Sequence, residues 1–290
     1  NNDLRQDLAS LRNKYGIFLD HYLSNLLKVN APHDSMTIKN LSVFVHDRDI
    51  NGAFHQSQKI FTDEEISGIC NELNDCIKRF SFYFPNRKLP KKFITCQSGW
   101  NYAFAYTDSV LVSSLDMYLG DSSIYYQMLQ LPNFRTRYMN RNYLLPDLIR
   151  GWIITEFDNS DPVNTLVHHT IFYGKIYYCV NALLPNIEDS VLMNYSGTQM
   201  KYLKEYEKNL WGHFAEKNRL YETNMKTIQE LTSDGPFTSA ISKECPPRIA
   251  MWIGLQIVRS YMKNNEKISL RELMEEKDAQ KILAKSKYRP

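Results

Sequence analysis

The sequence predicts an α+β fold that is mostly helical and carries a small sheet near its middle. Over most of the 290-residue chain, apolar residues recur every three or four positions, a spacing typical of amphipathic helices. Between residues 91 and 126 the pattern changes to short β-branched and aromatic runs separated by turn residues, which indicates strands. No Gly/Ser-rich or Pro-rich linker divides the chain, so we expect a single domain over residues 1–290.

Composition excludes several classes of protein. A hydrophobic content of 43% with a net charge of only +3 excludes a disordered chain. The balance of 35 basic and 32 acidic residues predicts that nucleic acid is not a partner. No apolar run approaches the roughly 18 residues that a membrane-spanning helix needs. The five cysteines form no Cys-x-x-Cys pair, and we expect them to act as small buried hydrophobic residues.

Residues 1–90 predict N-terminal helices. The first helix is expected from Leu4 to Leu26, because its apolar positions advance in steps of three and four. A polar stretch over residues 30–35 interrupts the pattern. Thr62 and Glu65 have the spacing of a capping box and predict the start of a second long helix, which ends before Pro85.

Residues 91–126 predict a sheet of three or four strands, antiparallel for the most part. The turn residues between the runs predict strands at Phe93–Cys96, Asn101–Tyr106 and Val110–Ser113. The segment 115–126 begins like another strand but contains Asp116 and Gly120. We therefore expect this segment at the edge of the sheet or in a loop that borders a cleft.

Residues 141–290 predict a helical remainder. The expected helices cover about Tyr143–Phe157, the segment from Asp161 to just before Pro185, Ser196–Phe214, Arg248–Met262, and a last helix that Ser269 caps. In the fourth of these, Trp252, Leu255 and Val258 share one face and are expected to be buried. Lys263 and Asn264 are expected to end that helix in solvent.

Common catalytic and nucleotide-binding motifs are absent from the sequence. It contains no phosphate loop, no Gly-x-Gly-x-x-Gly turn and no Gly-x-Ser-x-Gly elbow. His168 and His169 are adjacent, so on a helix they diverge by about 100° and cannot share a metal as an i, i+4 pair would. We expect no cofactor.

Five blocks of sequence nevertheless resemble a known family when they are taken in order. They are LDMYLG (115–120), LPDLIRGWIITEF (145–157), GKIYY (174–178), PFTSAISKECPPRIAMWIGLQIVRSYM (236–262) and SKYRP (286–290). Together they are similar to the gliding-motility lipoprotein GldB family of Bacteroidetes, and the resemblance runs from roughly Leu4 to Pro290. It implies an envelope lipoprotein that faces the periplasm and is held by a lipid-modified cysteine upstream of Asn1. It also implies that the partners are other envelope proteins of the gliding machinery and its linked secretion apparatus.

The GldB family in turn resembles zinc-dependent proteases of the zincin type, which implies a zincin-like helical domain. Those enzymes bind zinc through His-Glu-x-x-His on one helix and a Glu beside a glycine on the next. The matching positions here are Asp147–Gly151 and the Tyr173-Gly174 pair. Neither His-Glu nor His-x-x-x-His occurs anywhere in the chain. The resemblance therefore implies a degenerate site without metal, and hence a pseudoenzyme.

The resemblance to these enzymes implies an inherited cleft, and the residues expected to line it are the candidate site residues. They are Asp116, Tyr118, Asp147, Arg150, His169 and Tyr173. Two alternatives to a non-catalytic role remain open at this point. The first is a peptidase-like hydrolase with a rebuilt site that uses His168 or His169, Asp147 and Glu156. The second is a module that binds cell-wall glycans or peptides through the tyrosine-rich surface.

Overall fold

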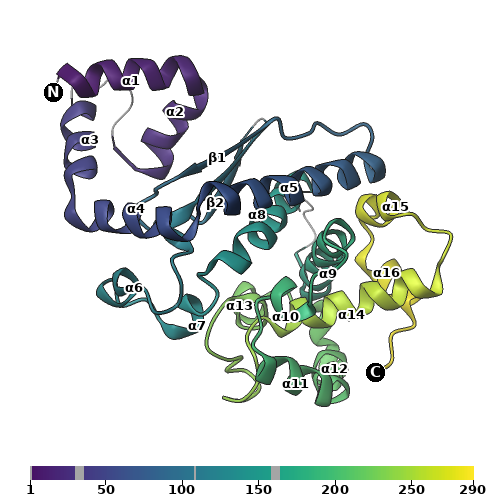
Figure 1. Cartoon of the computed structure of the whole chain (residues 1–290). Helices are drawn as coiled ribbons and strands as arrows, with labels where there is room; N and C mark the ends of the chain where they lie inside the picture. Colours follow the sequence, from purple (N-terminus) through teal and green to yellow (C-terminus); the bar gives the residue numbers. More distant parts are fainter. Residues whose placement is uncertain (1, 30–35, 108, 158–163) are drawn as a thin grey trace. The chain divides into compact units, whose positions relative to one another are not determined.

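The computed structural model describes residues 2–29, 36–107, 109–157 and 164–290 (Figure 1). They form a mostly helical structure with one small sheet, which confirms the predicted α+β class. Residue contacts group the chain into two compact units. The first unit holds Asn1–Asn74 and Lys88–Trp152, and the second holds Asp75–Arg87 and Ile153–Pro290. That the whole chain is a single domain stays a prediction.

The first unit contains the sheet and the helices around it. Its strands are β1 (Lys92–Cys96), β2 (Phe104–Thr107) and β3 (Val110–Ser114). Its helical elements are α1 (Asn2–Tyr15), α2 (Ile17–His21), the π-helical turn η1 (Tyr22–Leu26), α3 (Thr37–His46), α4 (Arg48–Ile60), the start of α5 (Asp63–Tyr83), the 3-10 turn η2 (Leu115–Met117), α6 (Ile124–Met128), α7 (Asn133–Thr136) and most of α8 (Arg141–Glu156).

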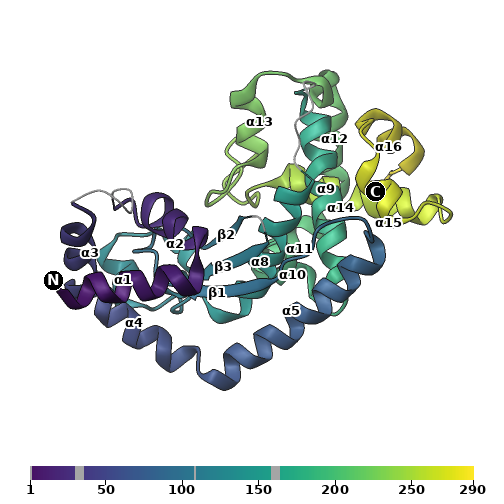
Figure 2. The ribbon, with the colours of Figure 1, turned by 90° about the horizontal axis from the view of Figure 1, so that it is seen from above.

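The sheet is mixed, so the prediction of mostly antiparallel pairing is wrong for one of its two ladders. The strand order is β1-β3-β2; β1 runs parallel to β3, and β2 runs antiparallel to it. Figure 2 shows β3 between the other two strands. The segment 115–126 adds no fourth strand. It forms η2, an isolated bridge between Leu119 and Asn140, and α6.

Successive residues of the strands face opposite sides of the sheet. Val112 of β3 belongs to a hydrophobic cluster with Phe18 and Leu26 from the N-terminal helices. On the other side, Tyr106 of β2 packs on Trp152 of α8, with 6.4 Å between ring centroids. The sheet of the first unit is therefore covered on both faces.

The N-terminal helices differ from the prediction at two places. The expected helix Leu4–Leu26 breaks at Gly16, whose φ of 57° lies in the left-handed region, where glycine is favoured. The sequence also did not predict α3 and α4. One signal for α4 was present, because the Asp47 side chain accepts hydrogen bonds from the backbone of Asp49 and Ile50 as an N-cap. The predicted polar stretch 30–35 lies outside the described residues.

Helix α5 follows the prediction closely. It ends at Tyr83, before Pro85, and the backbone N–H of Glu65 donates to the Thr62 hydroxyl at 3.3 Å. The capping box predicted that the Glu65 carboxylate would accept a hydrogen bond from the backbone at the start of the helix. It accepts one from Arg141 of α8 at 3.0 Å.

The second unit is built around α9 (Leu166–Leu183) and α14 (Ile249–Asn264), which lie against each other. The other elements are the end of α5, the last turn of α8, α10 (Asp189–Leu192), α11 (Gly197–Glu205), α12 (Glu207–Ala215), the 3-10 turn η3 (Glu216–Tyr221), α13 (Met225–Thr232), α15 (Leu270–Glu275) and α16 (Ala279–Ser286). The capping boxes at Ser196 and Ser269 are confirmed. Trp252, Leu255 and Val258 are buried, and Lys263 and Asn264 are exposed, as predicted.

Three predicted helix boundaries in this unit need comment. The helix expected over Ser196–Phe214 is two helices, because the chain leaves helical geometry at Tyr206. Ser269 does not cap the last helix, since α16 follows with Asp278 as its N-cap. The expected helix start at Asp161 lies outside the described residues, within which α9 begins at Leu166.

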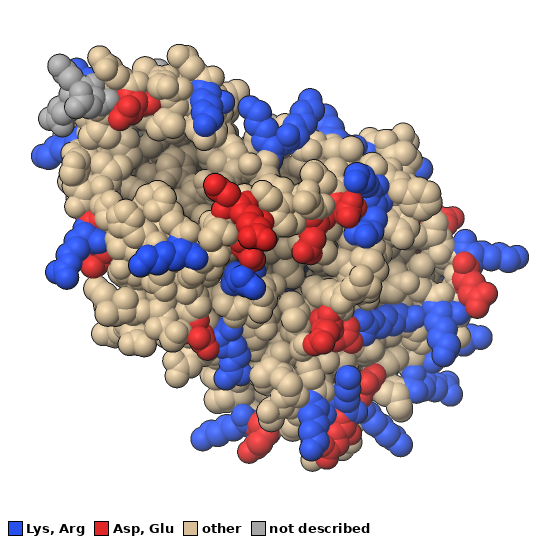
Figure 3. Space-filling model, in the orientation of Figure 1, with Lys and Arg blue, Asp and Glu red and all other residues tan. Residues whose placement is uncertain are grey.

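All five cysteines are free thiols. Cys76, Cys179 and Cys245 are buried as predicted, whereas Cys70 and Cys96 are half-buried. At the surface, basic and acidic side chains are interspersed on the face drawn in Figure 3, as the near-equal numbers of the two kinds predict.

Candidate functional site

Asp116 is a buried carboxylate that holds the loop between β1 and β2. It lies in η2 and is 1% exposed. Its Oδ2 accepts hydrogen bonds from the backbone N–H groups of Ser98 at 3.0 Å and Trp100 at 2.8 Å. Burial raises the pKa of the Asp116 carboxyl, and these hydrogen bonds oppose the shift. The carboxylate thus satisfies backbone donors that would otherwise be left unpaired.

The loop around Asp116 has an unusual backbone. Gly99 and Trp100 both have positive φ, at 65° and 59°, and this region is unfavourable for a residue such as Trp. Two contacts hold Trp100 there: the hydrogen bond to Asp116 and a stacked ring contact with Tyr125, with 5.7 Å between centroids. Asp116 therefore works as a structural anchor of this loop.

Tyr118, Asp147 and Arg150 meet in a second polar cluster of the first unit. The Tyr118 hydroxyl donates to Asp147 Oδ2 at 3.2 Å, and Arg150 Nη2 donates to Asp147 Oδ1. Asp147 and Arg150 lie about one turn apart on α8. Burial, together with the charge of Asp147, raises the pKa of Tyr118 well above its usual value, so its hydroxyl stays a donor. The cluster links the end of η2 to α8.

The other two predicted residues lie on α9, in the second unit. His169 Nε2 is hydrogen-bonded to Asn164 Oδ1, and burial lowers the pKa of His169. Tyr173 packs edge-on against Phe172 with 5.3 Å between ring centroids, and burial raises its pKa. The structure therefore brings three of the six predicted residues into direct contact, namely Tyr118, Asp147 and Arg150.

The remaining residues of the possible rebuilt hydrolase site also have partners. His168 Nδ1 lies 2.6 Å from the Thr165 hydroxyl oxygen. Glu156 forms an ion pair with Arg87 at 3.4 Å. Within the described ranges, no group of three or more His, Cys, Asp or Glu side chains is placed to hold a metal ion.

Helix packing explains the glycine that matches the zinc-protease pattern. Gly174 lies in the middle of α9, and a Cβ atom built on it would lie 2.3 Å from the carbonyl oxygen of Gly254 in α14. Real Cβ atoms do not approach a backbone this closely, so only glycine allows the two helices to touch. The glycine of the Tyr173-Gly174 pair therefore has a packing reason in this chain.

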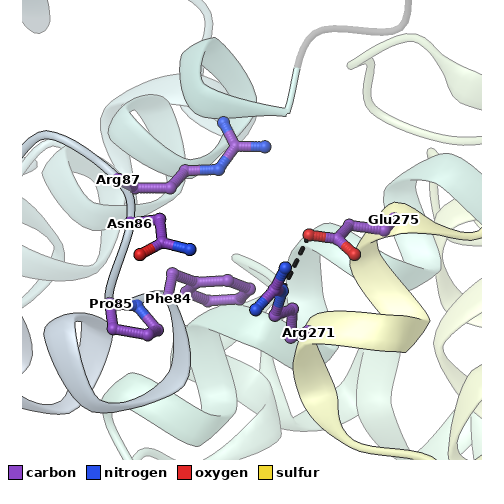
Figure 4. A pocket seen from close by; sticks show the side chains of 6 residues that line it. All are labelled: Phe84, Pro85, Asn86, Arg87, Arg271 and Glu275. Atoms are coloured by element: carbon purple, nitrogen blue, oxygen red, sulfur yellow. Dashed lines mark hydrogen bonds and ion pairs between the residues drawn. The ribbon is translucent and has the colours of Figure 1, made fainter.

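A pocket of about 180 Å³ opens on the second unit. Phe84, Pro85, Asn86 and Arg87, which follow α5, line it together with Arg271 and Glu275 of α15. Figure 4 shows Arg87 and Asn86 on one side, Arg271 and Glu275 on the other, and the Phe84 ring between them. Sequence reasoning missed this site because its residues come from segments far apart in the chain. Each arginine alone has the appearance of an ordinary surface residue.

The comparison with family models shows which protein family this chain belongs to. The family described as gliding motility protein GldB, whose model carries a lipoprotein label, matches residues 1–290. The chain belongs to the GldB family. Neither the search of curated proteins nor the search of solved structures found a match.

The match confirms the part of the sequence resemblance that concerns GldB and gliding motility. The further likeness of GldB proteins to zinc-dependent proteases stays a prediction. Among the described residues of this GldB chain, no helix is both long and apolar enough to cross a bilayer.

Proposed function

We propose that this GldB-family chain works without catalysis, by binding other envelope proteins of the gliding machinery and its linked secretion apparatus. The observation that carries the proposal is that both predicted cleft carboxylates accept hydrogen bonds from other parts of the fold. Asp116 accepts hydrogen bonds from a backbone loop, and Asp147 accepts from Tyr118 and Arg150. Carboxylates that are buried and paired in this way contribute to the fold, and this structural use supports a role that depends on contacts with partners.

The location of the chain is part of the same proposal. The lipoprotein label of the family supports an envelope protein attached to the membrane by a lipid. An acyl chain anchors a folded domain without any apolar span in the polypeptide. We propose that the anchor is an upstream cysteine and that the folded chain faces the periplasm. In this view the fold descends from a zincin-type protease and has become a pseudoenzyme, a relation that rests on the sequence pattern alone.

A test of catalysis separates this proposal from a hydrolase with a rebuilt site. Purified protein is incubated with a peptide library and a series of divalent metals, and product is measured by mass spectrometry. We expect no turnover above the buffer background. His169→Ala and Glu156→Gln are the matched variants, because neither residue anchors a loop of the sheet. Turnover that either substitution removes, with the melting temperature retained, would overturn the proposal.

A test of contact uses the chain in its cell. In cells of a gliding species whose own copy of the gene has been deleted, we expect His169→Ala to restore gliding as well as the unchanged chain does. Chemical crosslinking of these cells, followed by mass spectrometry, is expected to join the chain to other envelope proteins. Restored gliding with crosslinks only inside the chain would count against a role in binding.

A further inference from the structure

The pocket between Arg87 and Arg271 has the composition of an anion site. Its charged lining residues are two arginines and Glu275, and Arg87 also pairs with Glu156. The remaining lining residues are the Asn86 amide and the apolar surfaces of Phe84 and Pro85. An anionic group with a short apolar stem would find both kinds of contact in this pocket.

Arg87 is held in place before any ligand arrives. Its guanidinium lies over the ring of Phe157, 4.2 Å from the centroid, and its Nη1 donates to the backbone and side chain of Glu156. An arginine has five N–H donors in a planar fork, and these bonds engage Nη1 alone. The Nε and Nη2 groups of Arg87 have no recorded partner in the part of the chain that the structure describes.

Arg271 supplies the opposite wall. Its Nε donates to Glu275 Oε1 at 3.0 Å, and its side chain is 49% exposed. Its two terminal nitrogens have no recorded partner among the described residues. Each arginine thus already binds one carboxylate of this chain, and each keeps N–H groups that suit another.

The size of the pocket and the charges around it limit the kinds of group that it can bind. A pocket of about 180 Å³ is smaller than the roughly 300–1,000 Å³ of pockets that hold whole small-molecule ligands, so it fits one side chain or one small group. A phosphate group carries about −1.5 to −2 charges at pH 7, whereas a carboxylate carries one. Because the two arginines already pair with two carboxylates of the chain, an added anion meets less repulsion when it carries one negative charge than when it carries nearly two, which favours a carboxylate over a phosphate.

We propose that this pocket binds a carboxylate side chain of a partner protein, with the carboxylate between Arg87 and Arg271 and its methylene groups against Phe84. The inference rests on the proposed function, because it names one place where a partner would bind. An acidic residue next to an apolar one is the partner chemistry that the lining predicts.

The test is a titration of the purified chain with acetyl-Leu-Glu-amide, followed through the ¹⁵N-labelled arginine Nε–Hε signals in NMR spectra. We expect the signals of Arg87 and Arg271 to shift with an affinity in the millimolar range. Acetyl-Leu-Gln-amide, which lacks only the charge, is expected to bind about tenfold more weakly or not at all, because a charge-assisted hydrogen bond is lost.

Three variants test which side chains are responsible for binding in this titration. Arg271→Gln is expected to weaken binding about tenfold or more. Arg141→Gln is the matched control, since Arg141 has a similar side-chain exposure of 54% and also pairs with a glutamate, but lies in the other unit. It should leave the titration unchanged. Glu275→Gln removes the internal competitor for Arg271 and is expected to tighten binding.

Several results would overturn the inference. They are equal binding by the Glu and Gln peptides, equal loss in Arg271→Gln and Arg141→Gln, weaker binding by Glu275→Gln, or shifts produced by inorganic phosphate and not by the peptide. None of these results bears on catalysis. The proposed function fails in a different experiment, by turnover in the peptide-library assay, so the two failures are distinguishable.

Discussion

Each unit contains a helix that packs against its neighbour through a glycine, and the two contacts differ in what lies opposite the glycine. In the first unit, a Cβ on Gly151 of α8 would lie 1.8 Å from a ring atom of Phe104 on β2. In the second unit, a Cβ on Gly254 of α14 would lie 1.9 Å from the backbone oxygen of Thr170 on α9. One neighbour is a side chain and the other is a main chain.

The difference sets how each contact can respond to added volume. A phenyl ring at the edge of a small sheet can turn or shift at moderate cost. A helix backbone cannot shift in this way, because its carbonyl oxygen accepts a hydrogen bond within the helix and moves only when the whole helix moves. The centre of the second unit should therefore tolerate change less well than the helix-on-sheet contact of the first.

The largest effect is expected from Trp252→Ala. Trp252 is 2% exposed on α14, two residues before Gly254. Helices whose backbones already touch have little room to close a cavity, so we expect a loss of about 3–5 kcal/mol in the free energy of unfolding, measured by urea denaturation. A loss below about 0.5 kcal/mol would place Trp252 on the surface.

Gly254→Ala tests the backbone contact directly. We expect it to lower the free energy of unfolding by about 3 kcal/mol, because the two helices must separate. Gly212→Ala is the matched control in the same unit, since a Cβ at Gly212 in α12 meets nothing within 4 Å. The control should gain about 0.5–1 kcal/mol from helix propensity. If the two variants behaved alike, the close crossing of α9 and α14 would be refuted.

Lys175 adds a pH dependence to the packing of α9. Its ammonium is buried and donates to the carbonyl oxygens of Met274 and Glu276 near the end of α15. Burial lowers its pKa to about 8 from 10.5, with Glu276 opposing the shift and Lys277 adding to it. The unfolded chain therefore holds this proton more tightly than the folded chain does, between pH 8 and 10.5.

The sign of the effect follows from that difference. The contribution of Lys175 to stability is lowest below pH 8 and rises as the pH increases towards 10.5. We expect the stability difference between the unchanged chain and Lys175→Met to shift by about 2–3 kcal/mol in favour of the unchanged chain over this window. Denaturation curves at several pH values measure it, and a constant difference would contradict the buried ammonium.

The smallest loss is expected from Gly151→Ala. Phe104 has to move away from the new methyl group, which we expect to cost about 1–2 kcal/mol. Gly68→Ala in α5 is its control, because a Cβ there also meets nothing within 4 Å. A loss as large as that of Gly254→Ala would show that the ring is as immovable as a backbone, and the contrast between the units would disappear.

Part of the candidate site was predictable and part was not. The sequence pointed to Tyr118, Asp147 and Arg150, and the structure joins them in one cluster. The sequence did not indicate that Asp116 accepts hydrogen bonds from the loop at Ser98 and Trp100, because that loop is distant along the chain and carries no motif. It also did not indicate the pocket of Arg87 and Arg271, whose residues meet only after folding.

The sequence by itself determined the features that depend on neighbours within a few residues. The capping boxes at Ser196 and Ser269, the end of α5 before Pro85 and the buried face of α14 all follow from i to i+4 relations. Family membership was also readable, because it lies in the order of residues.

The tertiary structure alone decided the features that depend on distant segments. Whether β1 runs parallel or antiparallel to β3 depends on the path of the loop that Asp116 holds. The need for glycine at position 174 depends on the approach of α14. In both cases the structure is determined by contacts between residues far apart in the chain. Local secondary-structure propensity contains no information about such contacts.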